Sequence, residues 1–209
     1  MTKLGSRKWI FIGSGVVIFL AFLVWLFTIS TKPLPGAEVL QDGRSHVAEG
    51  SKVDYKFNPP TSGDHYGSWI IKGFYDEPRV DGNLVHSMEH GYIVLWYDCT
   101  KQFPISNFQF PMVYAQTQPM TQGSEGSPSA TLKDMPKAFS DGSCDGMKDS
   151  IKAVLNKFGP HKLIAMPRVG MDSPIILTAW GRMLKLNTLD EPALREFIGA
   201  FRDNGPEQT

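Results

Sequence analysis

The apolar run near the N-terminus constrains what this chain can fold into more than any other feature. No charged residue occurs between Trp9 and Ile29, and only a few small or hydroxyl-bearing residues interrupt the apolar side chains. A helix rises about 1.5 Å per residue, so a run of this length matches a bilayer core roughly 30 Å thick. We therefore expect one transmembrane anchor at residues 9–29.

The charges before this run predict its orientation. Lys3, Arg7 and Lys8 precede it, and no acidic residue does. By the positive-inside rule, residues 1–8 stay in the cytoplasm and the rest of the chain lies on the other side of the membrane. A cleaved signal peptide is the alternative, but its apolar region spans only about 7–15 residues, and residues 28–33 contain no small-x-small cleavage site.

After the anchor, the sequence predicts a short linker and one globular domain. Residues 30–40 contain Pro33 and Pro35 and read as an extended linker, whereas residues 41–209 suffice for one domain with its own core. The chain has 21 basic and 21 acidic residues. With three of the basic residues before the anchor, the exported part carries a net charge of about −3, which argues against a nucleic-acid partner.

The two cysteines, Cys99 and Cys144, agree with an extracytoplasmic location. An even pair in an oxidising compartment is more often a structural disulfide than a redox site. Two buried free thiols are the alternative, because two cysteines alone do not establish proximity.

The hydrophobic pattern of the domain predicts an α+β fold, a mixed β-sheet covered by helices. The continuous apolar run at residues 92–97 predicts a central strand. A short helix at residues 83–90, with Asn83 as N-cap and Gly91 after its end, precedes that strand. Residues 116–146 are polar and rich in Gly, Ser and Pro, so we expect a long loop. Further strands are expected at 53–57, 69–71, 112–115, 162–166, 174–180 and 183–186, and further helices at 147–158 and from about 190 to 204.

The histidines carry the main functional signal. Four of the five, at positions 46, 65, 86 and 90, fall before the central strand or at its start. On the short helix His86 and His90 are four residues apart and Glu89 is three from His86, so all three lie on one face. His65 in the preceding Gly-flanked turn can add a third nitrogen. This pattern predicts a transition-metal site built on His65, His86 and His90.

The fourth ligand and the metal remain open. His46, a carboxylate such as Glu89, water, or the thioether of Met166 or Met171 can complete the site. Three nitrogens with sulfur favour copper, and three nitrogens with oxygen favour zinc. The alternative is that these histidines only hydrogen-bond turns and helix ends in a structural or interaction domain of a membrane complex.

A third hypothesis is a metal-dependent hydrolase. Residues 86–90 fit the H-x-x-E-H pattern of inverted zinc peptidases, in which the glutamate activates the metal-bound water. Those enzymes carry the pattern on a long helix, however, whereas here Gly91 and an apolar strand follow at once. We therefore expect a binding protein rather than an enzyme.

Three separated blocks, at residues 59–66, 85–92 and 178–182, resemble a bacterial family of membrane-anchored extracytoplasmic proteins, the domain of unknown function 3105. The resemblance covers roughly residues 46–207 and implies a bacterial cell membrane as location. It names no activity. We expect a membrane-anchored protein that handles copper or zinc or supports a complex of other membrane proteins. The residues matching the family's blocks include His65, Tyr66, His86, Glu89, His90 and Trp180.

Overall fold

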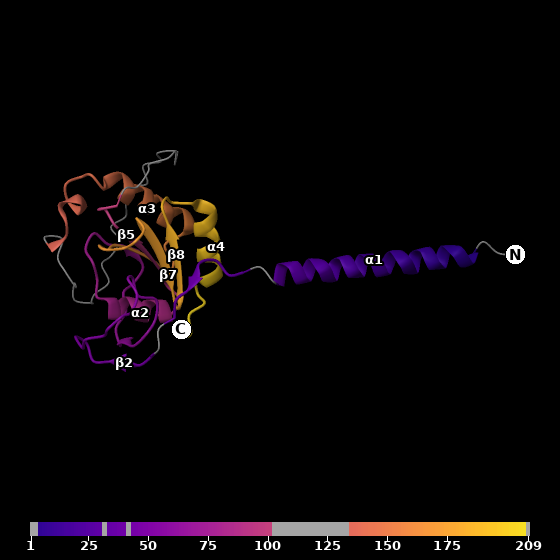
Figure 1. Ribbon diagram of the computed structural model, residues 1–209, viewed down its shortest axis with the longest axis horizontal. Coiled ribbons are helices and arrows are strands. Elements are labelled where there is room, and N and C mark those ends of the chain that lie inside the picture. The colour runs from indigo at the N-terminus through magenta and orange to yellow at the C-terminus, as the bar shows by residue number, and fades with distance from the viewer. Residues whose placement is uncertain (1–3, 31–32, 41–42, 102–133, 208–209) are drawn as a thin grey trace. The chain divides into compact units, whose positions relative to one another are not determined.

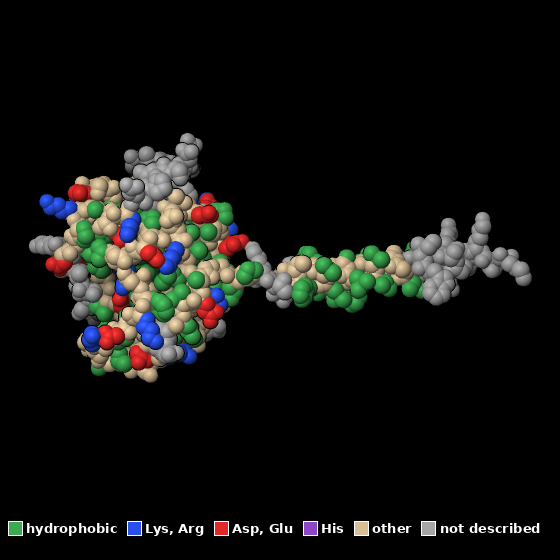
Figure 2. All heavy atoms as spheres, in the orientation of Figure 1, with side chains coloured by type: hydrophobic (Ala, Val, Ile, Leu, Met, Phe, Trp, Pro, Cys, Tyr) green, Lys and Arg blue, Asp and Glu red, His purple; other side chains and the backbone are tan. Residues whose placement is uncertain are grey.

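The computed structural model describes residues 4–30, 33–40, 43–101 and 134–207, and the chain forms two compact units, Met1–Leu34 and Pro35–Thr209. The first unit is the helix α1 (Leu4–Ser30). Its segment Phe11–Thr28 has a mean hydropathy of 2.4 and is long and apolar enough to cross a membrane, properties that N-terminal signal sequences share. Apolar side chains line its described part (Figure 2).

The second unit is built on a six-stranded mixed sheet with the order β1-β8-β7-β5-β6-β4. All five residues of its central strand β5 (Ile93–Tyr97) are buried. This strand pairs in parallel with β6 (Leu163–Pro167) and antiparallel with β7 (Ile175–Ala179). The remaining strands are β1 (Ala37–Glu38), β4 (Gly73–Phe74) and β8 (Arg182–Leu186). A separate parallel pair joins β2 (His46–Val47) and β3 (His65–Tyr66).

Helices cover both faces of the sheet, which confirms the predicted α+β class (Figure 1). Alternate residues of β5 enter two different core clusters because successive strand side chains point to opposite faces. On one face, α3 (Asp145–Phe158), α4 (Glu191–Phe201) and the 3₁₀ helix η2 (Lys137–Phe139) bury Ile151 and Phe197. On the other face, α2 (Asp81–Glu89) buries Leu84 and Met88. Each such side chain contributes about 1.5–3 kcal/mol on burial.

Two expected strands are absent from the described residues around the start of the domain. Residues 53–56 alternate between partly buried and exposed, as a strand would, but Phe57 is exposed and no neighbouring strand pairs with the segment. Instead, Tyr55 packs against the core and its hydroxyl donates to the carbonyl of Asp64 at 2.7 Å. Residues 69–71 are also irregular, and the edge strand β4 forms two residues later. The expected strand at 112–115 lies outside the described residues.

The boundaries of several elements differ from expectation. The helix α2 begins at Asp81 after Val80, so Asn83 is not its N-cap, and the Asn83 amide donates to the carbonyl of Ser68 at 2.9 Å. The strand β1 lies within the segment expected to be linker, at residues 37–38. The segment expected to be loop at 116–146 contains η2 and the start of α3 in its described part.

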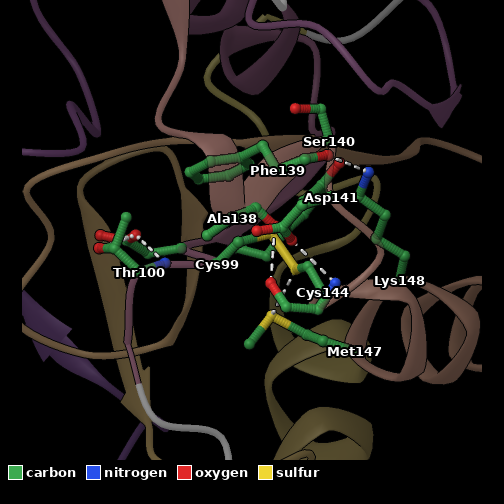
Figure 3. The surroundings of a disulfide bond; sticks show 12 residues. Cys99, Thr100, Ala138, Phe139, Ser140, Asp141, Cys144, Met147 and Lys148 are labelled. Carbon is green, nitrogen blue, oxygen red and sulfur yellow. Dashed lines mark hydrogen bonds between the residues drawn. A yellow bond between two sulfur atoms is a disulfide. The ribbon is translucent and has the colours of Figure 1, made fainter.

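A disulfide links Cys99, just after β5, to Cys144, the residue that precedes α3. Their Cα atoms are 5.5 Å apart. Cys144 is buried in the same core cluster as Phe139 and Met147, and Figure 3 shows both beside the bridge. The disulfide therefore ties the end of the central strand to the beginning of a covering helix.

Candidate metal centre

The helix α2 positions the candidate site because nearly all of it is buried. Gly82 through Glu89 are buried, and the apolar Leu84, Val85 and Met88 point into the core. The polar side chains on the rest of the helix are therefore buried as well and require partners from other segments. Those partners come from β2, β3 and the segments around them.

Strand pairing places two histidines side by side against this helix. In the parallel pair β2 and β3, His46 is in register with His65. One ligand nitrogen from each of His46, His65 and His86 lies within 4.8 Å of the others. His90, one helical turn beyond His86, contacts it with 2.8 Å between the two Nε2 atoms. We call these four histidines together with Glu89 the histidine cluster.

Backbone carbonyls determine which ring nitrogens are free. The Nδ1 of His65 lies 2.8 Å from the carbonyl oxygen of Gly63, and the Nδ1 of His86 lies 2.6 Å from that of Tyr66. Since a carbonyl oxygen only accepts, both Nδ1 atoms carry a proton. In the neutral rings the lone pair is then on Nε2, which points into the cluster. This arrangement, with one ring nitrogen tied to the backbone, is typical of metal-binding histidines.

The Nε2 atoms of His65 and His86 face a carboxylate oxygen and a second imidazole nitrogen. The Nε2 of His65 lies 2.8 Å from a carboxylate oxygen of Glu89, and the Nε2 of His86 faces that of His90. Each contact needs a proton or a cation to be favourable. Two ligands of a tetrahedral ion with bonds of about 2.0–2.1 Å are roughly 3.3 Å apart. The separations of the cluster's donor atoms, 2.8 Å in these two contacts and up to 4.8 Å among His46, His65 and His86, lie on either side of this value.

Glu89 is buried and held by a cation. Its other carboxylate oxygen accepts from the Nε of Arg44, and the Nε2 of His46 lies 3.7 Å from Glu89. Burial by itself raises the pKa of Glu89, but the hydrogen bonds and charges of Arg44 and His65 more than offset this and hold the pKa below its ordinary value of 4.5. Glu89 is thus ionised at neutral pH and adds negative charge to the cluster.

The same environment keeps His86 neutral. Burial lowers the pKa of His86 below 6.5, and the nearby His90, His65 and His46 lower it further, against the opposing effect of the hydrogen bond to Tyr66. A neutral imidazole is the form that binds a metal ion. The site therefore combines a neutral imidazole at His86 with an anionic carboxylate at Glu89.

Aromatic side chains surround the cluster. The Trp69 ring lies 5.4 Å from that of His86 and 5.3 Å from that of His90, and the Trp180 ring lies 5.9 Å from that of His65, centroid to centroid. Tyr66, besides its carbonyl contact, donates its hydroxyl to the carbonyl of Ser51 at 2.6 Å. These rings restrict the orientations of the imidazoles.

The structure brings the predicted histidines into contact but changes their grouping. Among the described residues, His90 is in neither of the two groups whose ligand atoms converge. The second of these groups joins His46, His86, Glu89 and Glu207. Met166 and Met171 are packed in the apolar core, with 0% and 2% of their surface exposed.

Sequence reasoning missed Arg44, Trp69 and Glu207. Arg44 lies two residues before His46, and its spacing carried no signal for the site. Trp69 lies in the segment 69–71, which the sequence predicts as a strand. Glu207 follows Gly205 and Pro206, beyond the predicted end of the last helix near residue 204.

Comparison with known proteins gives a family but no activity. The sequence model of one family, described as "Protein of unknown function (DUF3105)", matches residues 46–119 and 138–209. No curated protein and no solved structure matches the chain. The match contains the whole histidine cluster.

Proposed function

The chain belongs to the DUF3105 family of proteins of unknown function, and we propose that it binds a divalent transition-metal ion at the histidine cluster. The observation that carries this proposal is the convergence of His46, His65 and His86 within 4.8 Å. In His65 and His86, Nδ1 donates its proton to a backbone carbonyl, so Nε2 is the nitrogen that faces the cluster. A bound ion would take the place of the proton in the His65–Glu89 and His86–His90 contacts.

The donor set favours zinc, with Cu²⁺ as the next candidate. The cluster offers imidazole nitrogens and carboxylate oxygens, and three nitrogens with one oxygen is a common zinc environment. Copper(I) prefers sulfur, and the methionines considered as ligands are packed in the core. His46 is the accessible member, with 53% of its side chain exposed, so an ion would enter from its side.

We place this domain outside the cytoplasm, anchored by α1. A disulfide is stable in oxidising compartments, and α1 is long and apolar enough to span a bilayer. The role that fits is metal handling at a membrane surface, or support of a complex of membrane proteins. The hydrolase alternative receives less support, because both oxygens of Glu89 are engaged by Arg44 and His65.

Metal stoichiometry of the full chain in detergent tests the proposal. The purified protein is stripped with a chelator, loaded with Zn²⁺ or Cu²⁺, desalted and analysed for bound metal. We expect about one ion per chain, and loss of the ion in His86→Ala and in His46→Ala, whose exposed side chain makes no core contact that folding needs. The matched control is His161→Ala, which removes an exposed histidine outside the cluster. Wild-type protein without bound metal, or full metal content in both cluster variants, would refute metal binding and favour the structural alternative.

A further inference from the structure

The segment after α4 returns to the end of α2. The backbone N–H of Asp203 donates to the carbonyl of Gly91 at 3.0 Å, and the N–H of Glu207 donates to that of Glu89 at 3.1 Å. Residues 203–207, here called the C-terminal strap, thus satisfy carbonyls at the end of α2 that the helix itself leaves unpaired.

The approach is close enough to require glycine. A Cβ on Gly205 would collide with the carbonyl oxygen of Glu89 and with the backbone nitrogen of Gly91. Gly91 itself has a φ of +79°, and a Cβ there would meet the backbone of Asp203 at 2.9 Å. The path of the strap over the helix end is therefore specified by the backbones of both segments.

This path delivers a carboxylate to the histidine cluster. A carboxylate oxygen of Glu207 lies within 4.8 Å of ligand atoms of His46, His86 and Glu89. Among the described residues, no lysine or arginine is within ion-pair distance of Glu207. Two carboxylates therefore lie beside the imidazoles of the cluster, with Arg44 against Glu89, and this set of nitrogen and oxygen donors suits a divalent ion.

We propose that the C-terminal strap closes the metal site, with Glu207 as its displaceable ligand. This inference rests on the proposed metal binding and adds how the ion is retained and released. The histidines and Glu89 are held by β2, β3 and α2, whereas Glu207 is exposed and belongs to a segment at the end of the described chain. Such an element opens at lower free energy than the core. Opening of the strap removes one ligand and leaves the nitrogens in place.

The test compares zinc release from full-length variants in detergent. Glu207→Gln keeps the size of the side chain but removes the charged ligand, and Glu196→Gln makes the same change on the exposed face of α4. Protein loaded with Zn²⁺ is mixed with excess chromogenic chelator, and affinity and release rate are measured. We expect Glu207→Gln to bind zinc about ten- to a hundredfold more weakly and to release it faster, at the scale known for groups supporting metal ligands. Glu196→Gln should match wild type.

A second variant and a second measurement distinguish failure of the strap proposal from failure of metal binding itself. Gly205→Val should displace the strap and reproduce the Glu207→Gln effect with the carboxylate intact. In Co²⁺-loaded protein, both variants should change the visible absorption bands, which report the ligand set. If wild type binds zinc but Glu207→Gln matches it in affinity, release and Co²⁺ spectrum, the strap proposal is overturned and metal binding stands. If wild type binds neither Zn²⁺ nor Co²⁺, both proposals fail.

Discussion

Removal of the Cys99–Cys144 disulfide should lower the free energy of unfolding by about 4 kcal/mol. The bridge closes a loop with a sequence separation of 45 residues. In the chain-entropy model, the unfolded chain regains about 13 cal/mol/K when a loop of this size opens, which at 25 °C amounts to the stated free energy. Cys144 is 95% buried in the core, so the folded state gains little conformational entropy when the bridge is broken. The entropy gain therefore belongs almost entirely to the unfolded chain.

Thermal unfolding of the full chain in detergent, with and without a reductant, measures this effect. For a domain of this size, about 1 kcal/mol corresponds to roughly 2–4 °C, so the midpoint should fall by about 8–16 °C. The double variant Cys99→Ser/Cys144→Ser should unfold like the reduced wild type, and reductant should not affect it further. Equal midpoints for oxidised and reduced wild type, or two titratable thiols in protein prepared under oxidising conditions, would refute the reasoning.

Three further predictions concern the cluster and the anchor. Because the pKa values of His86 and Glu89 are lowered, the unfolded chain binds protons more readily than the folded one, so the thermal midpoint of the metal-free protein should fall as pH drops below 6.5 and again below 4.5. His86→Gln should lack the first decrease, and a constant midpoint between pH 7 and 5 would contradict this. Glu89→Gln should weaken zinc binding less than His86→Ala in chelator competition, and equal or greater weakening would show that the carboxylate dominates. A reporter fused after Thr209 that is active only outside the cytoplasm should work, whereas activity of a cytoplasm-only reporter would reverse the topology.

Local patterns predicted the elements whose stability depends on their own residues. The strand β5 is a continuous apolar run because it is buried on both faces, and the apolar residues of α3 and α4 recur at helical spacing because one side of each helix packs on the sheet. The segment 53–57 shows the limit of this reasoning. Its burial alternates only from residue 53 to residue 56, no partner strand pairs with it, and Tyr55 is anchored through its hydroxyl instead.

The candidate site was only partly predictable because contacts between distant segments build it. His86 and Glu89 share a helix face, which helical spacing reveals. The register that places His46 beside His65 depends on pairing between segments 19 residues apart, and no local pattern encodes it. Glu207 reaches the cluster only through the fit of Gly205 against the end of α2. Long-range backbone contacts of this kind become visible only once the chain is folded.

The parallel pairing of β5 with β6 has a consequence for the rate of folding. About 65 residues separate the two strands, so bringing them together requires closure of a long loop, whereas the β7–β8 hairpin closes locally. The disulfide joins two residues within this crossover that are 45 positions apart. Once it has formed, the loop between β5 and β6 is effectively shortened to about 20 residues. Loop closure then becomes about 1 kcal/mol less costly, which corresponds to roughly a fivefold faster encounter of the strands if closure limits the rate. Oxidation early in folding would therefore speed the assembly of the central sheet, and a chain held reduced would remain longer with the edges of β5 unpaired.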